Sequence, residues 1–222
     1  MQTINESDFS NIFFRNDELC TLNACPGDQV YGETLYTTDN YEYRAWNPHR
    51  SKLAALILNG CKFLPLNEDT DILYLGAANG TTASHISDIA VNGNIYCIEF
   101  SVRAFRDLLK VGSIRKNLFP ILEDAFHPDR YRSMIGQVDL LYQGLAQRDQ
   151  VRSFTINAKQ FLKPDGYGIF MVKSRSIDIS RAPSEIFDKV IKELKLAGFR
   201  ILEKHSLEPY SKDHIGLVLK FK

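Results

Sequence analysis

Residues 71–82 read DILYLGAANGTT, an apolar run typical of a buried strand that passes directly into a loop of small residues. The loop, GAANG at 76–80, lacks the G-x-G-x-x-G spacing of the turn that holds the pyrophosphate of a dinucleotide. Small residues nevertheless let backbone N–H groups approach a ligand closely, because no Cβ intervenes. The stretch therefore predicts a strand that ends at a ligand, and a ligand that is not held by its phosphates.

Segments of strand and helix type alternate from this stretch to the end of the chain. Apolar runs predict strands over residues 71–76, 94–100, 118–124, 138–143, 167–173, 199–207 and 215–222. Helical spacing predicts helices over residues 51–61, 81–90, 102–115, 148–162 and 184–198. This alternation predicts an α/β fold of Rossmann-like type: a mostly parallel sheet with helices on both faces, completed by an antiparallel pair of strands.

The first part of the chain differs from the rest, because it is rich in aromatic residues and turns. A Pro-Gly pair at 26–27 and an Asp-Asn pair at 39–40 are turn signals between short runs of strand type. We therefore expect a small N-terminal β domain over residues 1–46 and a Rossmann-like domain over residues 47–222. Trp46, at the junction, is expected to be a packing anchor between the two domains.

The whole chain has no excess charge, since 27 Lys and Arg residues balance 27 Asp and Glu residues among 222. Nucleic-acid binding would therefore need a local basic patch, or a partner that brings the nucleic acid. No apolar run approaches the ~18 residues of a membrane span, and the N-terminus does not resemble a signal peptide. We expect a cytoplasmic location with no membrane partner.

The four cysteines, Cys20, Cys25, Cys61 and Cys97, contain no CxxC pair. Cys61 and Cys97 lie in apolar runs, so we expect them to be buried thiols of a cytosolic protein. No metal site is expected.

Acidic residues end the next two predicted strands along the chain. Glu99 follows Gly80 by about 20 residues, the distance at which a carboxylate accepts hydrogen bonds from the hydroxyls of a ribose. Asp124 ends the following strand, where it can accept from an adenine amino group. Together with the loop, these acids predict an S-adenosylmethionine (SAM) site, because SAM has a ribose and an adenine but no phosphate. The alternative is a plain strand-to-helix turn beside surface carboxylates.

Seven segments make this interpretation specific, because together and in collinear order they resemble fibrillarin. They are YGE (31–33), YRAWNPHRSKLAALIL (43–58), ILYLGAANGTTASHISDI (72–89), YCIEFSVRAFRDLL (96–109), ILEDAFHPDRY (121–131), VKSRSID (172–178) and LEPYSKDH (207–214). The resemblance extends from Gly27 to Lys220 and is to the archaeal type. Fibrillarins are the ribose 2′-O-methyltransferases of box C/D guide ribonucleoproteins. The resemblance therefore implies SAM-dependent methylation of rRNA or tRNA by a Rossmann-like methyltransferase domain that carries a small N-terminal β domain.

The resemblance also assigns residues to the cofactor and to the chemistry. With the glycine loop included, the cofactor residues are Gly76, Ala77, Gly80, Thr81, Thr82, Glu99, Phe100, Asp124, Ala125, Gly144, Leu145, Ala146 and Gln147. Catalysis would use Lys52, Lys173 and His214 around the ribose hydroxyl. The partners implied are a Nop-type coiled-coil scaffold protein, a kink-turn-binding protein and a box C/D guide RNA, and no DNA partner is expected.

At one position the chain departs from the family pattern. The aspartate of the usual D-V-A-Q segment corresponds to Gly144 in QGLAQ (143–147). A carboxylate beside an amine favours the charged amine and fixes its position, and neither Gln143 nor Asp149 is expected to replace it. Two hypotheses follow: an active guide-directed methyltransferase, and a catalytically impaired or silent fibrillarin-like scaffold subunit. A small-molecule methyltransferase or polyamine-synthase-like enzyme is a third interpretation.

A group of basic side chains is expected near the predicted active face, where it could form a strip for RNA phosphates. Its members are Arg44, His49, Arg50, Lys52, Arg175 and Arg181. Plain structural interpretations stay open for Lys52, as a solvated helix residue, and for His214, as a turn residue.

Overall fold

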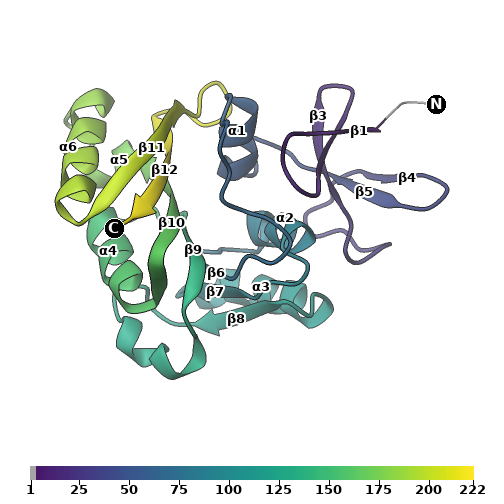
Figure 1. The fold of residues 1–222 in the computed structure, drawn as a ribbon, viewed down its shortest axis with the longest axis horizontal. Helices are drawn as coiled ribbons and strands as arrows, with labels where there is room; N and C mark the ends of the chain where they lie inside the picture. The colour runs from purple at the N-terminus through teal and green to yellow at the C-terminus, as the bar shows by residue number, and fades with distance from the viewer. Residues whose placement is uncertain (1–3) are drawn as a thin grey trace.

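The computed structural model describes residues 4–222, which form two sheets (Figure 1). The strands of the larger sheet are β6 (Ile72–Leu75), β7 (Ile95–Glu99), β8 (Leu118–Leu122), β9 (Val138–Gln143), β10 (Leu162–Lys173), β11 (Phe199–Ser206) and β12 (His214–Phe221). They lie in the order β11-β12-β10-β9-β6-β7-β8. Strands β10, β9, β6, β7 and β8 are parallel, and β12 is antiparallel to both β10 and β11. The predicted Rossmann-like sheet with an antiparallel end is confirmed.

The order of the strands reverses between β6 and β9. From β6 the chain moves outward through β7 to β8, and it then returns to place β9 against the other edge of β6. Ligands of such sheets bind beyond the carboxyl ends of the strands at the reversal. The residues that follow β6, β7 and β9 are therefore the ones that the fold brings together.

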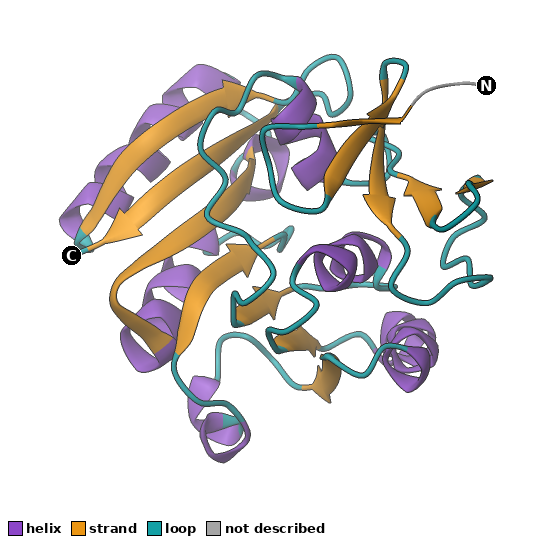
Figure 2. Cartoon of the chain, turned by 45° about the vertical axis from the view of Figure 1, so that its right-hand side comes forward, coloured by secondary structure: helices purple, strands orange, loops and turns teal. Residues whose placement is uncertain are grey.

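Helices cover both faces of this sheet (Figure 2). They are α1 (Lys52–Leu58), α2 (Thr81–Ile89), α3 (Val102–Ile114), α4 (Gln150–Phe161), α5 (Ser174–Ile177) and α6 (Pro183–Leu196), with short 3-10 turns η1 (Pro128–Arg130) and η2 (Arg132–Met134). Ile72 and Tyr74 of β6 pack with α1, α2 and α3, whereas Leu73 and Leu75 pack with α4 and α6. Burial on both faces explains why this strand is an unbroken apolar run. Within residues 4–222, no helix combines the length and the apolar character that crossing a membrane requires.

The largest difference from the predicted element boundaries lies at the start of β10. The helix predicted over 148–162 ends at Phe161, and β10 begins at Leu162 instead of at residue 167. A register shift against β9 between Leu162 and Tyr167 accommodates the Pro-Asp-Gly turn residues. These residues therefore form an irregularity within a strand, which pairing with the neighbouring strand tolerates.

The smaller sheet is antiparallel. Its strands are β1 (Ile4–Glu6), β2 (Ile12–Arg15), β3 (Glu18–Leu22), β4 (Leu35–Thr37) and β5 (Glu42–Ala45), in the order β1-β2-β3-β5-β4. Trp46, directly after β5, is fully buried and stacks on His85 of α2, with the ring centroids 4.8 Å apart. Its predicted role as a packing anchor is confirmed. Cys61 and Cys97 are buried free thiols, as predicted, and Cys20 is buried as well.

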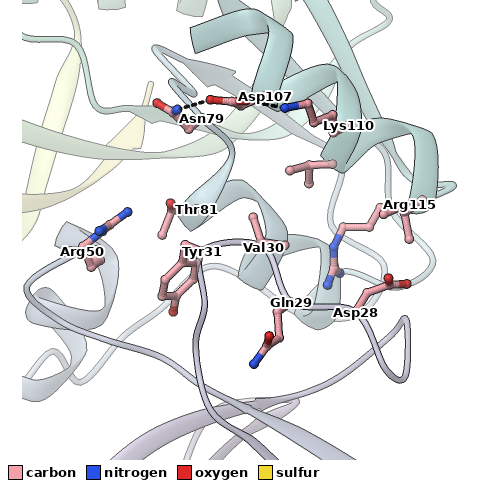
Figure 3. A pocket seen from close by; sticks show the side chains of 12 residues that line it. Asp28, Gln29, Val30, Tyr31, Arg50, Asn79, Thr81, Asp107, Lys110 and Arg115 are labelled. Carbon is pink, nitrogen blue, oxygen red and sulfur yellow. Dashed lines mark hydrogen bonds and ion pairs between the residues drawn. The ribbon is translucent and has the colours of Figure 1, made fainter.

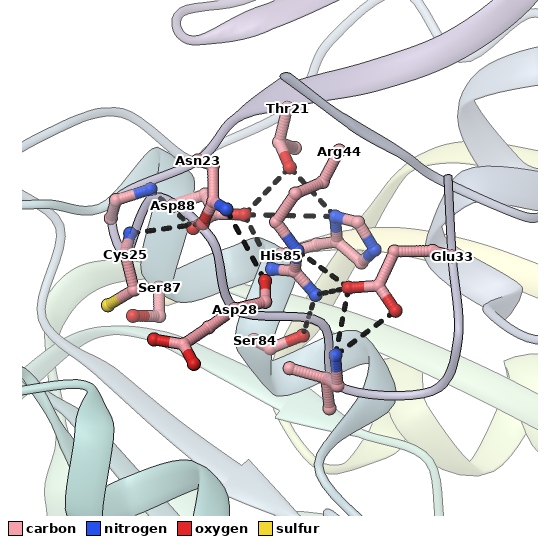
Figure 4. Close-up of polar contacts among 12 residues, drawn as sticks. Thr21, Asn23, Cys25, Asp28, Glu33, Arg44, Ser84, His85, Ser87 and Asp88 are labelled. Atoms are coloured by element: carbon pink, nitrogen blue, oxygen red, sulfur yellow. Dashed lines mark hydrogen bonds and ion pairs between the residues drawn. The ribbon is translucent and has the colours of Figure 1, made fainter. Parts of the chain in front are cut away.

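A buried ionic cluster joins the smaller sheet to the helices. Its members are Glu33, Arg44, Asp88 and Arg115, and the first three are labelled in Figure 4. Arg44 lies 2.5 Å from Glu33 and 2.7 Å from Asp88, and Arg115 also contacts Asp88 at 2.5 Å. Arg44 has no exposed surface, so the expectation that it contributes to an RNA-binding strip is wrong. Its acidic partners come from a loop and a helix that the local sequence does not connect with it.

His85 lies beside this ionic cluster on α2. Thr21 Oγ1 is 2.8 Å from its Nδ1, and the Tyr31 hydroxyl is 2.8 Å from its Nε2. Burial lowers the pKa of His85 well below its usual range, and the charges of Arg44 and Arg115 lower it further. The histidine is therefore neutral, and α2 is held against the smaller sheet by both charged and neutral polar contacts.

Candidate active site

The loop after β6 is shaped by two glycines in the left-handed region. Gly76 has a φ of +78° and Gly80 a φ of +86°, which side chains other than glycine rarely adopt. A Cβ at Gly76 would lie 2.6 Å from Leu145 Cδ2, and one at Gly80 would lie 3.0 Å from Val111 Cγ2. Backbone geometry and close packing therefore both require glycine here, and Ala77 between them is buried.

Helix α2 begins directly after this loop, with Gly80 as its N-cap and Thr81 and Thr82 in its first turn. Thr82 Oγ1 donates a hydrogen bond to Ser51 Oγ at 2.9 Å, and Ser51 is the N-cap of α1. Thr82 therefore connects the glycine loop to the helix that begins with Lys52.

Glu99 ends β7, and each oxygen of its nearly buried carboxylate accepts one backbone hydrogen bond. Oε2 accepts from Ala78 N–H at 2.9 Å, and Oε1 accepts from Ser101 N–H at 2.8 Å. Since a carboxylate offers about four acceptor sites, capacity remains for ribose hydroxyls. Phe100 follows with 57% of its surface exposed, so its ring is accessible for stacking on a base.

Asp124 lies in the turn after β8. Its Oδ1 accepts from Phe126 N–H at 2.9 Å, and its side chain is 44% exposed. Ala125 is buried, and its carbonyl accepts a hydrogen bond from the Asn157 side chain at 2.8 Å. The turn is therefore fixed by the protein while the carboxylate keeps acceptor capacity toward solvent.

Gly144 follows β9, across the strand reversal from the glycine loop. Its N–H donates to Leu75 O at 3.0 Å. A Cβ at Gly144 would meet only ordinary contacts, 3.6 Å from Gly76 O and 3.6 Å from Tyr74 Oη, and its φ lies outside the left-handed region. Neither packing nor backbone geometry therefore demands glycine at this position.

The residues around Gly144 do not replace the missing carboxylate. Gln143 is fully buried, and its Nε2 donates to Gln150 O at 2.8 Å, so its side chain is not available to replace a carboxylate at position 144. Ala146 is exposed and Gln147 is partly buried. Asp149 is exposed at the N-cap of α4 and forms no capping hydrogen bond. Within the described chain, it bonds to none of the predicted catalytic residues.

Lys52, Lys173 and His214 come together from three elements. Lys52 begins α1, Lys173 ends β10, and His214 begins β12 opposite Lys173 in the antiparallel register. Burial lowers the pKa of Lys52, and the charge of Lys173 lowers it further. Burial also lowers the pKa of His214, and the charges of both lysines act in the same direction. The three groups therefore lie within electrostatic reach of one another, and after the role predicted for them we call them the catalytic group.

The hydrogen bonds of His214 fix the orientation of its ring. Nδ1 lies 2.6 Å from Lys212 O, and because a carbonyl only accepts, Nδ1 carries the hydrogen. Nε2 is buried and has no partner among residues 4–222. The neighbouring Asp213 pairs with Arg175 at 3.0 Å. Among residues 4–222, neither Lys52 nor Lys173 has an acidic partner at ion-pair distance. The group therefore contains two amines and an imidazole without a bonded carboxylate.

A cavity of about 260 Å³ lies between Lys52, Gly144 and the glycine loop. Its lining residues are Arg50, Lys52, Tyr74, Gly76, Ala77, Ala78, Asn79, Thr81, Thr82, Tyr142 and Gly144. A second cavity, of about 360 Å³, extends between residues 28–31 and α3 (Figure 3) and shares Arg50, Asn79 and Thr81 with the first. The two cavities therefore adjoin at the start of α2.

Two tyrosines of the smaller cavity were not predicted. Tyr74 and Tyr142 pack edge to face with centroids 4.4 Å apart, and burial raises the pKa of both phenols. They therefore act as neutral hydrogen-bonding groups. The sequence could have indicated them, because side chains two residues apart in a strand point to the same side. Tyr74 and Tyr142 lie two residues before Gly76 and Gly144, respectively.

The expected basic strip is only partly present. His49 and Arg50 are exposed in the turn that precedes α1. Arg175 and Arg181 lie beyond β10, but each pairs with an aspartate, at 3.0 Å and 3.5 Å respectively. The charges of two members of the expected strip are therefore partly neutralised by aspartates.

The class of protein is defined by the fold together with the residues at the carboxyl ends of the parallel strands. A parallel sheet that reverses its order at a glycine loop, with acids at the next two strand ends, is the arrangement of Rossmann-like SAM-dependent methyltransferases. The chain shares the fold of a SAM-dependent methyltransferase from Aquifex aeolicus, with a TM-score of 0.56 over 80% of this chain and 90% of that chain, at 17% identity. The predicted fold class is confirmed.

Within this class the chain belongs to the fibrillarin family, whose model matches residues 4–222. It is similar to the fibrillarin-like rRNA/tRNA 2′-O-methyltransferase of Methanothermobacter thermautotrophicus, with 51% identity over 209 residues, which are 94% of this chain and 93% of that protein. The structure of Aeropyrum pernix fibrillarin with natively bound SAM has a TM-score of 0.90 and 42% identity, over 98% of this chain and 97% of that chain. A fibrillarin/Nop5p complex gives a TM-score of 0.90 and 40% identity, over 98% and 100% of the two chains.

Proposed function

We propose that this chain is the catalytic subunit of an RNA ribose 2′-O-methyltransferase that uses SAM. The observation that carries the proposal is the meeting of Lys52, Lys173 and His214 beside the cavity at the glycine loop. Such groups serve a reaction in which a hydroxyl must be positioned and must lose its proton. A relative with 51% identity is named for this activity on rRNA and tRNA.

The cofactor residues divide by the part of SAM that each would hold. Glu99 would accept from the ribose hydroxyls and Asp124 from the adenine amino group, with Phe100 against the base. The glycine loop and residues 144–147 would surround the methionine end. Both carboxylates keep acceptor capacity after their backbone hydrogen bonds, so the residues fit the cofactor. Bound SAM supplies a methyl group that is activated by its sulfonium.

The catalytic group would act on the ribose hydroxyl. The hydroxyl needs an acceptor for its proton and must lie within about 3–3.5 Å of the methyl carbon. His214 Nε2 has a lone pair and no partner in the described chain. The lowered pKa of Lys52 enlarges its neutral fraction, which can also accept a proton. Lys173, beside them, would donate to the hydroxyl oxygen and orient it.

Gly144 supports a second candidate function. A carboxylate at this position would hold an amine of the catalytic group in its charged form and in one place. Losing a positioned acid–base partner costs ~10²- to 10⁴-fold in rate. The alternative is therefore a subunit that binds SAM and its scaffold but is catalytically impaired or silent. Because Gly144 has room for a side chain, the two functions can be separated by a single substitution.

The deciding experiment measures transfer of labelled methyl from SAM to a guide-paired RNA in the assembled particle. The parent chain is compared with Gly144→Asp and with the control Gly136→Asp, which places the same side chain in open space at an exposed glycine. Transfer by the parent chain supports the active enzyme. Transfer by Gly144→Asp alone supports the impaired subunit. If no variant transfers methyl although assembly and SAM binding are intact, the proposed activity is wrong, and transfer to free metabolites without RNA would indicate a small-molecule enzyme.

We further infer that the chain works inside a particle in the cytoplasm. Its partners would be a Nop-type coiled-coil scaffold protein, a kink-turn-binding protein and a box C/D guide RNA. Two observations support this proposal: a fibrillarin of 40% identity forms a complex with Nop5p, and the basic strip of this chain is partly neutralised by aspartates. A guide RNA held by other proteins would then present the target ribose.

A further inference from the structure

A cluster of three potential metal ligands lies outside the lining of the two cavities described above. Cys61 follows α1, and Glu203 and His205 lie two residues apart on the edge strand β11, so their side chains share a face of that strand. Each side chain offers one ligand atom, and these atoms lie within 4.8 Å of one another. In the part of the chain that the structure describes, this is the one group of three or more such side chains with that spacing.

The ring of His205 lies where it shares a proton with Glu203, and such a proton can be exchanged for a metal ion. Its Nδ1 lies 3.2 Å from Asn59 O, and since a carbonyl only accepts, Nδ1 carries a hydrogen. Its Nε2 lies 2.6 Å from Glu203 Oε2. In a neutral His205, two acceptors would then face each other at hydrogen-bond distance. A proton therefore lies between them in the metal-free chain. A metal ion that took its place would bind with the two atoms further apart, since zinc ligands at about 2.0–2.1 Å in tetrahedral geometry lie about 3.3 Å from each other.

The carboxylate of Glu203 is held in place and charged. Its Oε1 and Oε2 accept from Lys62 N–H at 3.3 Å and 3.0 Å. Although burial alone would raise the pKa of Glu203, these backbone hydrogen bonds and His205 lower it overall. The side chains of His205 and Glu203 remain 19% and 17% exposed, so an ion can reach them from solvent.

Cys61 completes the cluster with a buried sulfur. Its Sγ makes one weak hydrogen bond, to Phe63 O at 3.4 Å. Burial, and then the charge of Glu203, raise the pKa of the thiol to about 12. Without a metal the thiol keeps its proton, and a metal ion that binds the sulfur displaces this proton to solvent.

We propose that Cys61, Glu203 and His205 form a binding site for Zn²⁺. A thiolate, an imidazole and a carboxylate are the donors that Zn²⁺ accepts, and three protein ligands leave its fourth tetrahedral position for water. The hydrogen bond from Nδ1 to a backbone carbonyl is the contact that orients a zinc-bound imidazole. The ion would join the segment after α1 to the edge strand β11. Because α1 begins at Lys52, the site would support the element that carries one member of the catalytic group.

The test uses the full-length, untagged chain after removal of metals with a chelator. The protein is supplied with excess Zn²⁺, desalted and analysed by mass spectrometry for metal content, and a parallel sample receives Co²⁺ for absorption spectroscopy. We expect stoichiometric zinc and a thiolate-to-cobalt charge-transfer band. Cys61→Ser and His205→Ala should lose both signals. Cys25→Ser is the matched control, because it removes a partly exposed thiol and should change neither.

Glu203→Gln separates a metal ligand from a structural clamp. Its amide oxygen can still accept from Lys62 N–H, so the fold of the segment is preserved while the charged ligand is lost. We expect Glu203→Gln to bind zinc at least about tenfold more weakly than the parent chain while its metal-free unfolding temperature changes little. The proposal is overturned if the parent chain retains no zinc, or if Cys61→Ser retains as much zinc as the parent. The first result would mean that only a proton joins His205 to Glu203, and the second that zinc binds without the sulfur of Cys61.

Discussion

A carboxylate at position 144 is expected to change the charge balance of the catalytic group, because Gly144 and Lys52 line the same cavity. In this chain burial and two lysines lower the pKa of His214. The carboxylate introduced by Gly144→Asp should raise the pKa of His214 and of Lys52, because an opposite charge favours the protonated form. NMR titration of the histidine ring protons measures the change at His214, and the exposed His49 serves as the internal control. An unchanged His214 would mean that the new carboxylate does not reach the group.

The same lowered pKa links stability to pH. Between the folded pKa of His214 and its unfolded value of about 6.5, only the unfolded chain binds the proton. Stability should therefore fall as the pH drops below about 6.5. His85 acts in the same direction, since its pKa is also lowered. Gly144→Asp should reduce the loss of stability at low pH that comes from His214 and leave the contribution of His85 unchanged.

Glu99 is the residue on which the ribose assignment depends. Glu99→Ala should weaken SAM binding by roughly 1–3 kcal/mol, because the ribose hydroxyls lose their acceptors. Glu99→Gln keeps one oxygen and should weaken binding less. Isothermal titration calorimetry measures both, with Glu68→Ala as a control at an exposed site before β6. Unchanged affinity in Glu99→Ala would refute the assignment.

At the scale of elements, the turn between β6 and α2 depends on close packing as well as on backbone conformation. Gly76→Ala and Gly60→Ala both place a Cβ on a left-handed residue, which costs about 1–2 kcal/mol. Only at Gly76 would this Cβ also collide with Leu145, whereas Gly60 has open space around it. Gly76→Ala should therefore lower the unfolding temperature more than Gly60→Ala and should also weaken SAM binding.

Thermal unfolding with and without SAM measures both effects of these alanine variants. Because SAM stabilises only the form that binds it, the rise in unfolding temperature on adding SAM should persist in Gly60→Ala and shrink in Gly76→Ala. Equal behaviour of the two variants would mean that Leu145 moves aside without consequence for the loop.

Elements that depend on local pattern could be predicted from the sequence. The apolar run 72–75 is bounded by a loop of small residues, so both the strand and the turn that follows it were predicted correctly. The strand β10 was predicted too short, because Pro-Asp-Gly at 164–166 is a turn signal that strand pairing overrides. Local propensity therefore gives the type of an element more securely than its ends.

Contacts between distant segments could not be predicted in the same way. Arg44 carries a charge that would normally be exposed, yet Glu33 and Asp88 make its burial possible. The cluster around Cys61 likewise forms only when β11 lies beside the segment after α1, more than a hundred residues earlier in the chain. The roles of the catalytic and cofactor residues remain predictions, which the experiments above test.

At the scale of the whole molecule, charge limits what the chain can do alone. The net charge is zero, and Arg175 and Arg181 are paired with aspartates. Since non-specific RNA binding is dominated by neutralising phosphates and weakens steeply with salt, the isolated chain should bind RNA poorly at physiological salt. Gel shifts with and without the scaffold protein measure this. Tight binding of bare RNA by the isolated chain would contradict the prediction.

The ionic cluster also limits how far the molecule can be divided. Asp88 receives Arg44 from one sheet and Arg115 from the end of α3, and the neighbouring His85 is covered by Trp46. Truncation of residues 1–46 would leave Asp88 with a single counter-ion. It would also expose to water one face of α2, the helix that begins directly after the glycine loop. The N-terminal part is therefore no detachable module, and a shortened catalytic core would be an incomplete enzyme instead of a minimal one.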